Sequence, residues 1–199
     1  MTTILQKLFP KRQPIIVVSG LPRSGTSMMM KMLEAGGIPP LTDHIRSADD
    51  DNPKGYYEFE RVKKLPDGDT AWLPEARGKA VKVIAALLMK LPPDYTYRVL
   101  FMRRDLDEVL ASQSKMLERR GEQKSVDDDT MKVLFQKHLK QVDAWMKDQP
   151  NVHYLNVDYN AMLRDPWPQI KSINRFLGGR LDEQAMAAVI DPQLYRQRR

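Results

Sequence analysis

Cysteine is absent from the 199 residues, and this absence excludes several kinds of chemistry at once. Without thiols the chain has no disulfides, no thiolate metal site and no cysteine nucleophile. Long apolar runs are also missing, because Lys82 interrupts the longest candidate at residues 80–89, so no membrane-spanning helix is predicted. The first residues hold only two apolar pairs, 4–5 and 8–9, which is too little for a secretory signal. We therefore expect a cytoplasmic protein.

Strong charge segregation, internal repeats and low-complexity segments are missing as well. The net charge of +6 suits an anionic ligand, but no basic block is interleaved with aromatic residues as a nucleic-acid surface would require. Hydrophobic content of 42% and charged content of 29% are ordinary for a globular protein. We expect one domain over residues 1–199, with an N-terminal arm at 1–13 and an insert at 38–79.

What the chain does contain is one organised stretch, IIVVSGLPRSGTSMMMKML, at residues 15–33. Its β-branched start at 15–18 predicts a buried strand, and Gly20, Pro22 and Gly25 predict a turn. Strong helix formers follow from Met28 until a Gly-Gly pair at 36–37 stops them. Strand, glycine-bearing loop and helix in this order are the context of a phosphate-binding loop, because the first helical amides attract an anion.

The loop departs from the nucleoside-triphosphatase pattern G-x-x-x-x-G-K-[ST] at one position. Thr26 stands where that pattern has lysine, and the positive charge lies inside the loop as Arg23. An ordinary strand–turn–helix connection would also be rich in Gly and Pro. One cation and three hydroxyls in a single turn favour the binding of phosphate.

The rest of the chain alternates strands with helices, which predicts an α/β fold. We expect three layers of P-loop type, with a mostly parallel sheet flanked by helices and ligands at the carboxyl ends of the strands. The segment after the first helix is rich in Pro, Asp, Asn and Gly and should be mostly loop. Further strands are predicted at 80–84, 97–102 and 152–157, and further helices at 85–91, 106–119, 127–148, 158–163, 166–177 and 182–189.

Two cations, Arg103 and Arg104, end the strand predicted at 97–102. A metal-dependent phosphotransferase usually has a carboxylate at such a strand end to hold magnesium. The missing loop lysine and the missing acid disfavour a magnesium–ATP hydrolase. Two cationic strand ends suit a ligand with separate anionic groups and no metal.

Both motifs resemble those of the sulfotransferase family. GLPRSGTS at 20–27 is similar to the family's 5′-phosphosulfate-binding loop, and VLFMRRDLDEVLAS at 99–112 is similar to its 3′-phosphate motif, with arginine and serine eight residues apart. VDYNAML at 157–163 and the later FLG at 176–178 extend the resemblance over most of the chain. The likeness is greater to the small bacterial branch than to the larger cytosolic animal enzymes.

The resemblance implies 3′-phosphoadenosine 5′-phosphosulfate as donor, no metal, and transfer of a sulfuryl group to a hydroxyl or amine. The acceptor would be a small molecule, a glycan or a peptide, and the oligomeric state stays open. The insert at 38–79 would lie on the acceptor side. By position, the 5′-phosphosulfate would be held by Arg23, Ser24, Gly25, Thr26 and Ser27, and the 3′-phosphate by Arg104 and Ser112. Alternation along the strand should turn Arg103 the other way, into a surface ion pair.

Two family features are not recognisable here: the histidine base of the animal branch and its late Gly-x-x-Gly-x-x-Lys loop. Arg196 and Arg198 stand where late contacts to the 3′-phosphate could come from. A solvated basic tail is an equal alternative for them.

In-line sulfuryl transfer needs a base near the acceptor and a cation near the leaving phosphate. Arg23 is our candidate for the cation, with Lys82 as a helper, although Lys82 could instead reach water. Glu58 and Glu60 are the candidates for the base, and a solvent-facing role is open for each. His44, in the same insert, is the next candidate. His138 is interpreted as a packed residue, and His153 has no assigned role.

Two other functions stay open at this stage. One is a P-loop kinase that uses ATP, against which the missing lysine counts. The other is a catalytically silent protein that binds nucleotide phosphates, which the sequence does not distinguish from an active enzyme.

Overall fold

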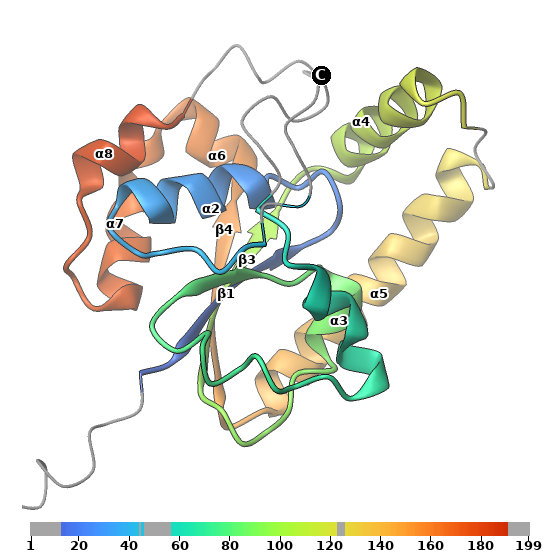
Figure 1. Ribbon diagram of the computed structural model, residues 1–199. Helices are drawn as coiled ribbons and strands as arrows, with labels where there is room; N and C mark the ends of the chain where they lie inside the picture. The colour runs from blue at the N-terminus through green and yellow to red at the C-terminus, as the bar shows by residue number, and fades with distance from the viewer. Residues whose placement is uncertain (1–12, 44, 46–56, 123–125, 191–199) are drawn as a thin grey trace, which may run out of the picture.

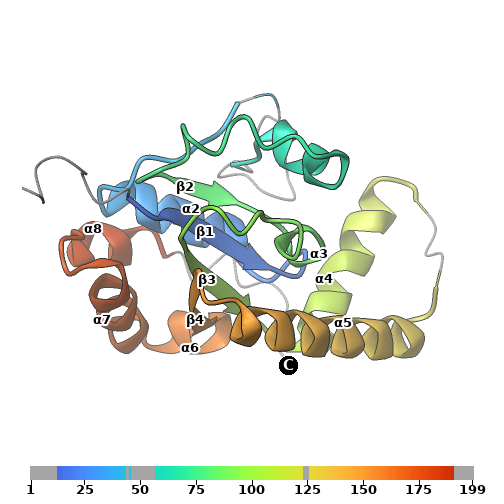
Figure 2. The same ribbon diagram turned by 90° about the horizontal axis from the view of Figure 1, so that it is seen from below.

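The computed structural model describes residues 13–43, 45, 57–122 and 126–190. Its centre is a sheet of four parallel strands in the order β2-β1-β3-β4 (Figures 1 and 2). Gly20 pairs with Met102, and Arg103 pairs with Asp158, so the strands end at the same edge of the sheet. The strands are β1 (Ile15–Gly20), β2 (Ala80–Lys82), β3 (Tyr97–Arg103) and β4 (Val152–Asp158).

Helices cover both faces of this sheet, which confirms the predicted α/β architecture. The face that carries Ile15 and Val17 packs against η1, α3 and α5, and the face that carries Ile16 and Val18 packs against α2, α6, α7 and α8. The helices are α2 (Thr26–Ala35), the 3-10 helix η1 (Glu60–Asp67), α3 (Ala85–Leu88), α4 (Leu106–Arg119), α5 (Asp128–Asp148), α6 (Tyr159–Arg164), α7 (Pro166–Leu177) and α8 (Glu183–Ala188).

The central strand β1 is buried along its whole length, as its β-branched sequence predicts. Its alternating side chains enter two separate hydrophobic clusters, one on each face of the sheet. The methionine run after the loop belongs to one of them, because Met29, Met30 and Met32 are fully buried. This burial holds the start of α2 firmly against the end of β1.

Several predicted boundaries are confirmed within a residue or two, including both ends of α4. α2 begins at Thr26 rather than at Met28, which places the end of the glycine loop inside the helix. β2 is shorter than the predicted strand, because the chain turns into α3 at Ala85, and α3 itself ends at Leu88.

The apolar side chains of α5 recur at helical spacing along one stripe, but this stripe is only partly buried. Val142 and Met146 lie in the core, whereas Leu134 is 49% exposed. The reason is visible in Figure 2, where the first half of α5 extends beyond the sheet and lies beside α4. The two helices form a hairpin that projects from the body of the molecule (Figures 1 and 2).

The insert at 38–79 was predicted as mostly loop. Its residues 57–79 nevertheless contribute side chains to the hydrophobic core. Trp72 is 1% exposed and its indole nitrogen donates to the Asp69 carbonyl at 3.0 Å. Phe59 packs edge-on against Trp72, with ring centroids 5.6 Å apart. This packing fixes the residues on either side of Phe59, which include both predicted bases.

Among the described helices, none has both the length and the apolar character needed to cross a bilayer.

Candidate functional site

The loop between β1 and α2 has no room for a side chain at Gly20 or at Gly25. A Cβ on Gly20 would lie 2.5 Å from Ser24 Oγ and 2.9 Å from the Met102 carbonyl. Gly25 has φ +97°, and a Cβ there would lie 2.4 Å from the Tyr159 ring. Arg23 also has a positive φ of 67°, which is uncommon for a residue with a side chain. The loop is therefore held tightly in one conformation by its neighbours.

The same loop has features that fit an anion of phosphate size. Gly25 is the N-cap of α2 and has no side chain that could cap the first amides of the helix, so these amides and the positive end of the helix dipole are suited to an anion. The Ser19 hydroxyl at the end of β1 is buried without a hydrogen-bond partner in the described part of the chain. The Ser24 side chain is buried, and its hydroxyl donates to the Leu21 carbonyl at 2.7 Å.

The structure brings the two sequence motifs into direct contact. Arg23 Nε donates to Ser112 Oγ at 3.0 Å, and Arg104 Nη1 donates to the Arg23 carbonyl at 2.9 Å. Ser112 lies on α4, eight residues after Arg104, as the motif spacing predicts. The loop and the β3–α4 junction therefore form one site at the carboxyl edge of the sheet.

Arg104 lies deeper than the sequence suggests. Its side chain is 7% exposed, its Nε donates to Glu108 at 3.0 Å, and its guanidinium lies over the Tyr159 ring at 4.7 Å from the centroid. Asn160 Nδ2 donates to the other oxygen of Glu108 at 2.9 Å. The sequence prediction missed Glu108 and Asn160, although an acid four residues after an arginine at a helix start was a usable signal.

Arg103 turns to the opposite side of β3, which confirms the expected alternation. It forms an ion pair with Asp143 on α5, and its Nε donates to Asn156 Oδ1 at 2.9 Å. Its guanidinium also lies 4.3 Å from the centroid of the Phe101 ring. Arg103 thus links β3 to α5 and stays apart from the loop.

Lys82, at the end of β2, is paired with an anion rather than extended to water. Its ammonium group donates to Ser27 Oγ at 3.2 Å and lies 3.8 Å from a Glu58 carboxylate oxygen. The Lys82 side chain is 9% exposed and that of Glu58 is 21% exposed. This arrangement connects the first turn of α2 to the insert.

The backbone around Glu58 is fixed by hydrogen bonds to residues 42 and 43. The Glu58 carbonyl accepts from Thr42 Oγ1 at 2.9 Å, and the Asp43 carboxylate accepts from the Glu60 amide at 2.6 Å. The Glu60 carboxylate forms a surface ion pair with Lys63 at 2.6 Å, and the Lys63 ammonium group also lies 3.9 Å from a Glu58 carboxylate oxygen. Of the two acids, Glu58 is the one beside Lys82.

Tyr57, just before Glu58, has a left-handed backbone with φ 53°. Its hydroxyl donates to the Glu34 carboxylate at the end of α2. Burial raises the pKa of the Tyr57 hydroxyl well above its usual value, and the hydrogen bond and negative charge of Glu34 raise it further. Tyr57 therefore stays protonated at neutral pH and ties the insert to α2.

The remaining candidates stand apart from this site. His44, Arg196 and Arg198 lie outside the described residues. His138 is half-buried on α5, with its Nε2 buried and without a hydrogen-bond partner among the described residues, and His153 is exposed on β4. No group of three or more His, Cys, Asp or Glu side chains in the described part is arranged to hold a metal ion.

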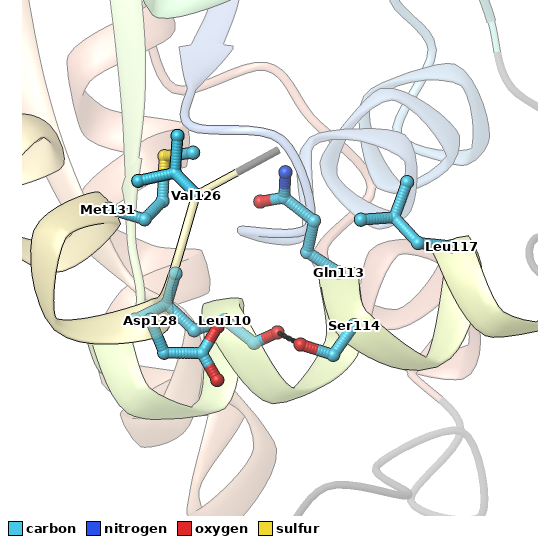
Figure 3. Close-up of a pocket in the computed structure, with 7 residues that line it drawn as sticks. All are labelled: Leu110, Gln113, Ser114, Leu117, Val126, Asp128 and Met131. Carbon is cyan, nitrogen blue, oxygen red and sulfur yellow. Dashed lines mark hydrogen bonds between the residues drawn. The ribbon is translucent and has the colours of Figure 1, made fainter. Parts of the chain in front are cut away.

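A separate pocket lies in the helical hairpin, between α4 and α5 (Figure 3). None of the predicted site residues that the structure describes lines it. Gln113 points into this pocket and leaves its carbonyl oxygen without a partner among the described residues. Its lining residues are Leu110, Gln113, Ser114, Leu117, Val126, Asp128 and Met131.

Comparison with known proteins connects this geometry to a family. The family model described as "Sulfotransferase domain" matches residues 13–195. A solved sulfotransferase domain from the Synechococcus PCC 7002 olefin synthase has a similar fold, with TM-score 0.54 and 16% identity over 94% of this chain and 88% of that one. A sulfotransferase domain from the curacin biosynthetic pathway gives TM-score 0.53 and 14% identity over 92% and 89%. No curated protein sequence matches this chain.

Proposed function

Since the chain belongs to the sulfotransferase domain family, we propose that it transfers a sulfuryl group from 3′-phosphoadenosine 5′-phosphosulfate to a hydroxyl or amine without a metal. The observation that supports this most strongly is the direct contact between the two motifs. Arg23 donates to Ser112, and Arg104 donates to the Arg23 carbonyl. These contacts bring the two motifs together at one sheet edge, where each motif would bind one phosphate. A donor with phosphates at both the 5′ and 3′ positions matches that arrangement.

On the donor side, the loop backbone and the first amides of α2 would bind the 5′-phosphosulfate. Gly20 and Gly25 allow this approach because they carry no Cβ. Ser112 and Arg104 would bind the 3′-phosphate. The bound donor would supply the sulfuryl group and the phosphate leaving group.

Arg23 would stabilise the negative charge that develops on the leaving phosphate. Its guanidinium donates to Ser112 Oγ, and a 3′-phosphate at Ser112 would compete with that contact. Lys82 lies within hydrogen-bonding distance of Ser27 in the first turn of α2, and it would add a second cation on the opposite side of the loop.

Glu58 would accept the proton of the attacking hydroxyl or amine. It lies at the described edge of the insert, 3.8 Å from Lys82, and its backbone is fixed by Thr42 and Asp43. A carboxylate near the loop but outside the predicted donor contacts is suited to the acceptor side. Glu60 has a weaker claim, because its carboxylate pairs with Lys63 at the surface.

The test is a transfer assay with labelled donor, a mixed pool of hydroxyl and amine acceptors, and excess EDTA. We expect label to move from the donor to an acceptor, and the rate to be unchanged by the chelator. An absolute requirement for magnesium, or transfer of phosphate from ATP under the same conditions, would contradict the proposal and favour a kinase. Tight donor binding without any transfer would favour the catalytically silent alternative.

A further inference from the structure

Glu108 is a buried acid at the centre of the proposed 3′-phosphate site. Its side chain is 6% exposed, and both carboxylate oxygens are engaged, one by Arg104 Nε and the other by Asn160 Nδ2. Asn160 in turn accepts from the Asp105 amide at 3.3 Å. Glu108 thereby connects the start of α4 to the β4–α6 junction.

This acid changes the charge that a ligand meets at Arg104. Arg104 and Glu108 together carry no net charge, and both are nearly removed from solvent, where charges act on each other most strongly. A phosphate that approaches Arg104 therefore also approaches a carboxylate. The two anions must share one guanidinium.

We propose that Glu108 is an internal counterion that competes with the 3′-phosphate for Arg104 and so limits the affinity for the bisphosphate product. The proposal rests on the proposed function, because it needs a 3′-phosphate at Arg104. The donor and the product, adenosine 3′,5′-bisphosphate, both carry this phosphate, and the product must leave after each transfer. A moderated affinity at this position shortens the time for which product occupies the site.

The competing interpretation is that Glu108 only holds Arg104 in position. The two interpretations predict opposite changes in affinity for the 3′-phosphate when Glu108 is neutralised. If Glu108 served only to hold Arg104 in position, its removal would weaken binding of the 3′-phosphate. If Glu108 is a counterion, its neutralisation strengthens that binding, because a like charge is removed and Arg104 is left to pair with the ligand. The sign of one affinity change therefore separates them.

The experiment compares Glu108→Gln with the wild-type chain by calorimetry, using adenosine 3′,5′-bisphosphate and AMP as probes. We expect the variant to bind the bisphosphate about tenfold or more tightly than the wild type, as removal of a nearby like charge predicts. Affinity for AMP, which lacks the 3′-phosphate, should change less than about twofold by the same argument. Glu118→Gln is the matched control, because it makes the same charge change at an exposed position of α4 and should alter neither affinity.

Glu108→Asp provides a second test, because Glu108→Gln leaves a buried arginine without its counterion and could unfold. The shorter acid keeps the charge, so we expect its bisphosphate affinity to stay within about threefold of the wild type. Weaker bisphosphate binding in Glu108→Gln, or a tenfold loss in Glu108→Asp, would overturn the counterion role. A wild-type chain that does not distinguish bisphosphate from AMP would instead contradict the proposed function itself.

Discussion

Arg23 has a position that no other described residue of the site shares. Its carbonyl accepts from Arg104, and its side chain donates to Ser112, while its own backbone has a positive φ. Arg23 therefore contacts the β3–α4 segment through both its backbone and its side chain. Its role in the proposed mechanism depends on the side chain alone.

Arg23→Ala should therefore lower kcat by about two to three orders of magnitude, because a cation at the leaving phosphate acts mainly in the transition state. Arg23→Lys keeps the charge and should recover part of the rate. The measurement is a rate assay with labelled donor at saturation. An unchanged kcat with a raised KM would place Arg23 in donor binding only.

Arg104→Ala should affect binding rather than kcat, and it should weaken the affinity for the bisphosphate. A charge-assisted contact of this kind contributes roughly 1.5–3 kcal/mol to binding. Calorimetry with the bisphosphate and AMP measures the change, and affinity for AMP serves as the internal reference. Equal losses for both nucleotides would mean that the variant damages the fold around Glu108 rather than a phosphate contact.

The two candidate bases make different predictions. Glu58→Gln should abolish most of the transfer while it leaves the bisphosphate affinity nearly unchanged, because Glu58 would take the proton of the acceptor and reaches the donor loop only through Lys82. Glu60→Gln should retain normal transfer, since Glu60 pairs with Lys63 at the surface. Both variants are assayed with labelled donor and a mixed acceptor pool. Normal turnover in Glu58→Gln with loss in Glu60→Gln would move the base by two residues, and normal turnover in both would leave His44 as the candidate.

At the scale of the elements, the site depends on the packing of the β1–α2 loop against the β4–α6 junction. Tyr159 is the contact, because its ring fills the space in which a Cβ of Gly25 would lie. Arg104 lies over the same ring. The loop, the 3′-phosphate arginine and α6 are thus packed as one unit.

Gly25→Ala tests this packing. A side chain there combines a positive φ with a clash against Tyr159, and we expect a loss of about 3 kcal/mol or more in the free energy of unfolding. Gly37→Ala is the control, because Gly37 has a similar φ of +99° but nothing within 4 Å of its Cβ position. The control should lose only about 1–2 kcal/mol. Urea unfolding of both variants gives the comparison, and equal losses would show that the Tyr159 contact is unimportant.

The helical hairpin makes a second prediction at this scale. Val142→Ala should lower the free energy of unfolding by about 1–3 kcal/mol, because Val142 is fully buried against the sheet. Leu134→Ala should cost less than about 0.5 kcal/mol, because Leu134 lies on the exposed outer half of α5. A large loss at Leu134 would mean that a partner covers this part of the helix in solution.

At the level of the whole molecule, local signals in the sequence were enough to predict the four strands, the α-helices and the two motifs, but not the 3-10 helix η1. The β-branched run of β1, the glycines of the loop and the Asp105 cap of α4 each depend on neighbouring residues only. The parallel α/β architecture followed from their alternation. The outward turn of Arg103 followed from the period of two along a strand.

What the sequence did not predict depends on contacts between distant segments. The strand order β2-β1-β3-β4 is not encoded in any single element. The burial of Trp72, within a segment that reads as loop, requires the sheet face against which it packs. The difference between the surroundings of Glu58 and Glu60 likewise depends on Lys82, which lies on a strand outside the insert.

In the proposed function, this sheet edge recognises a nucleotide with phosphates at both the 5′ and 3′ positions. Calorimetry of the purified chain in EDTA with adenosine 3′,5′-bisphosphate, AMP and, in magnesium buffer, ATP tests it most directly. We expect the bisphosphate to bind at least about tenfold more tightly than AMP, as charge-assisted contacts to a second phosphate predict, and magnesium–ATP not to bind comparably. Equal affinity for AMP and the bisphosphate, or tighter binding of magnesium–ATP, would contradict the account.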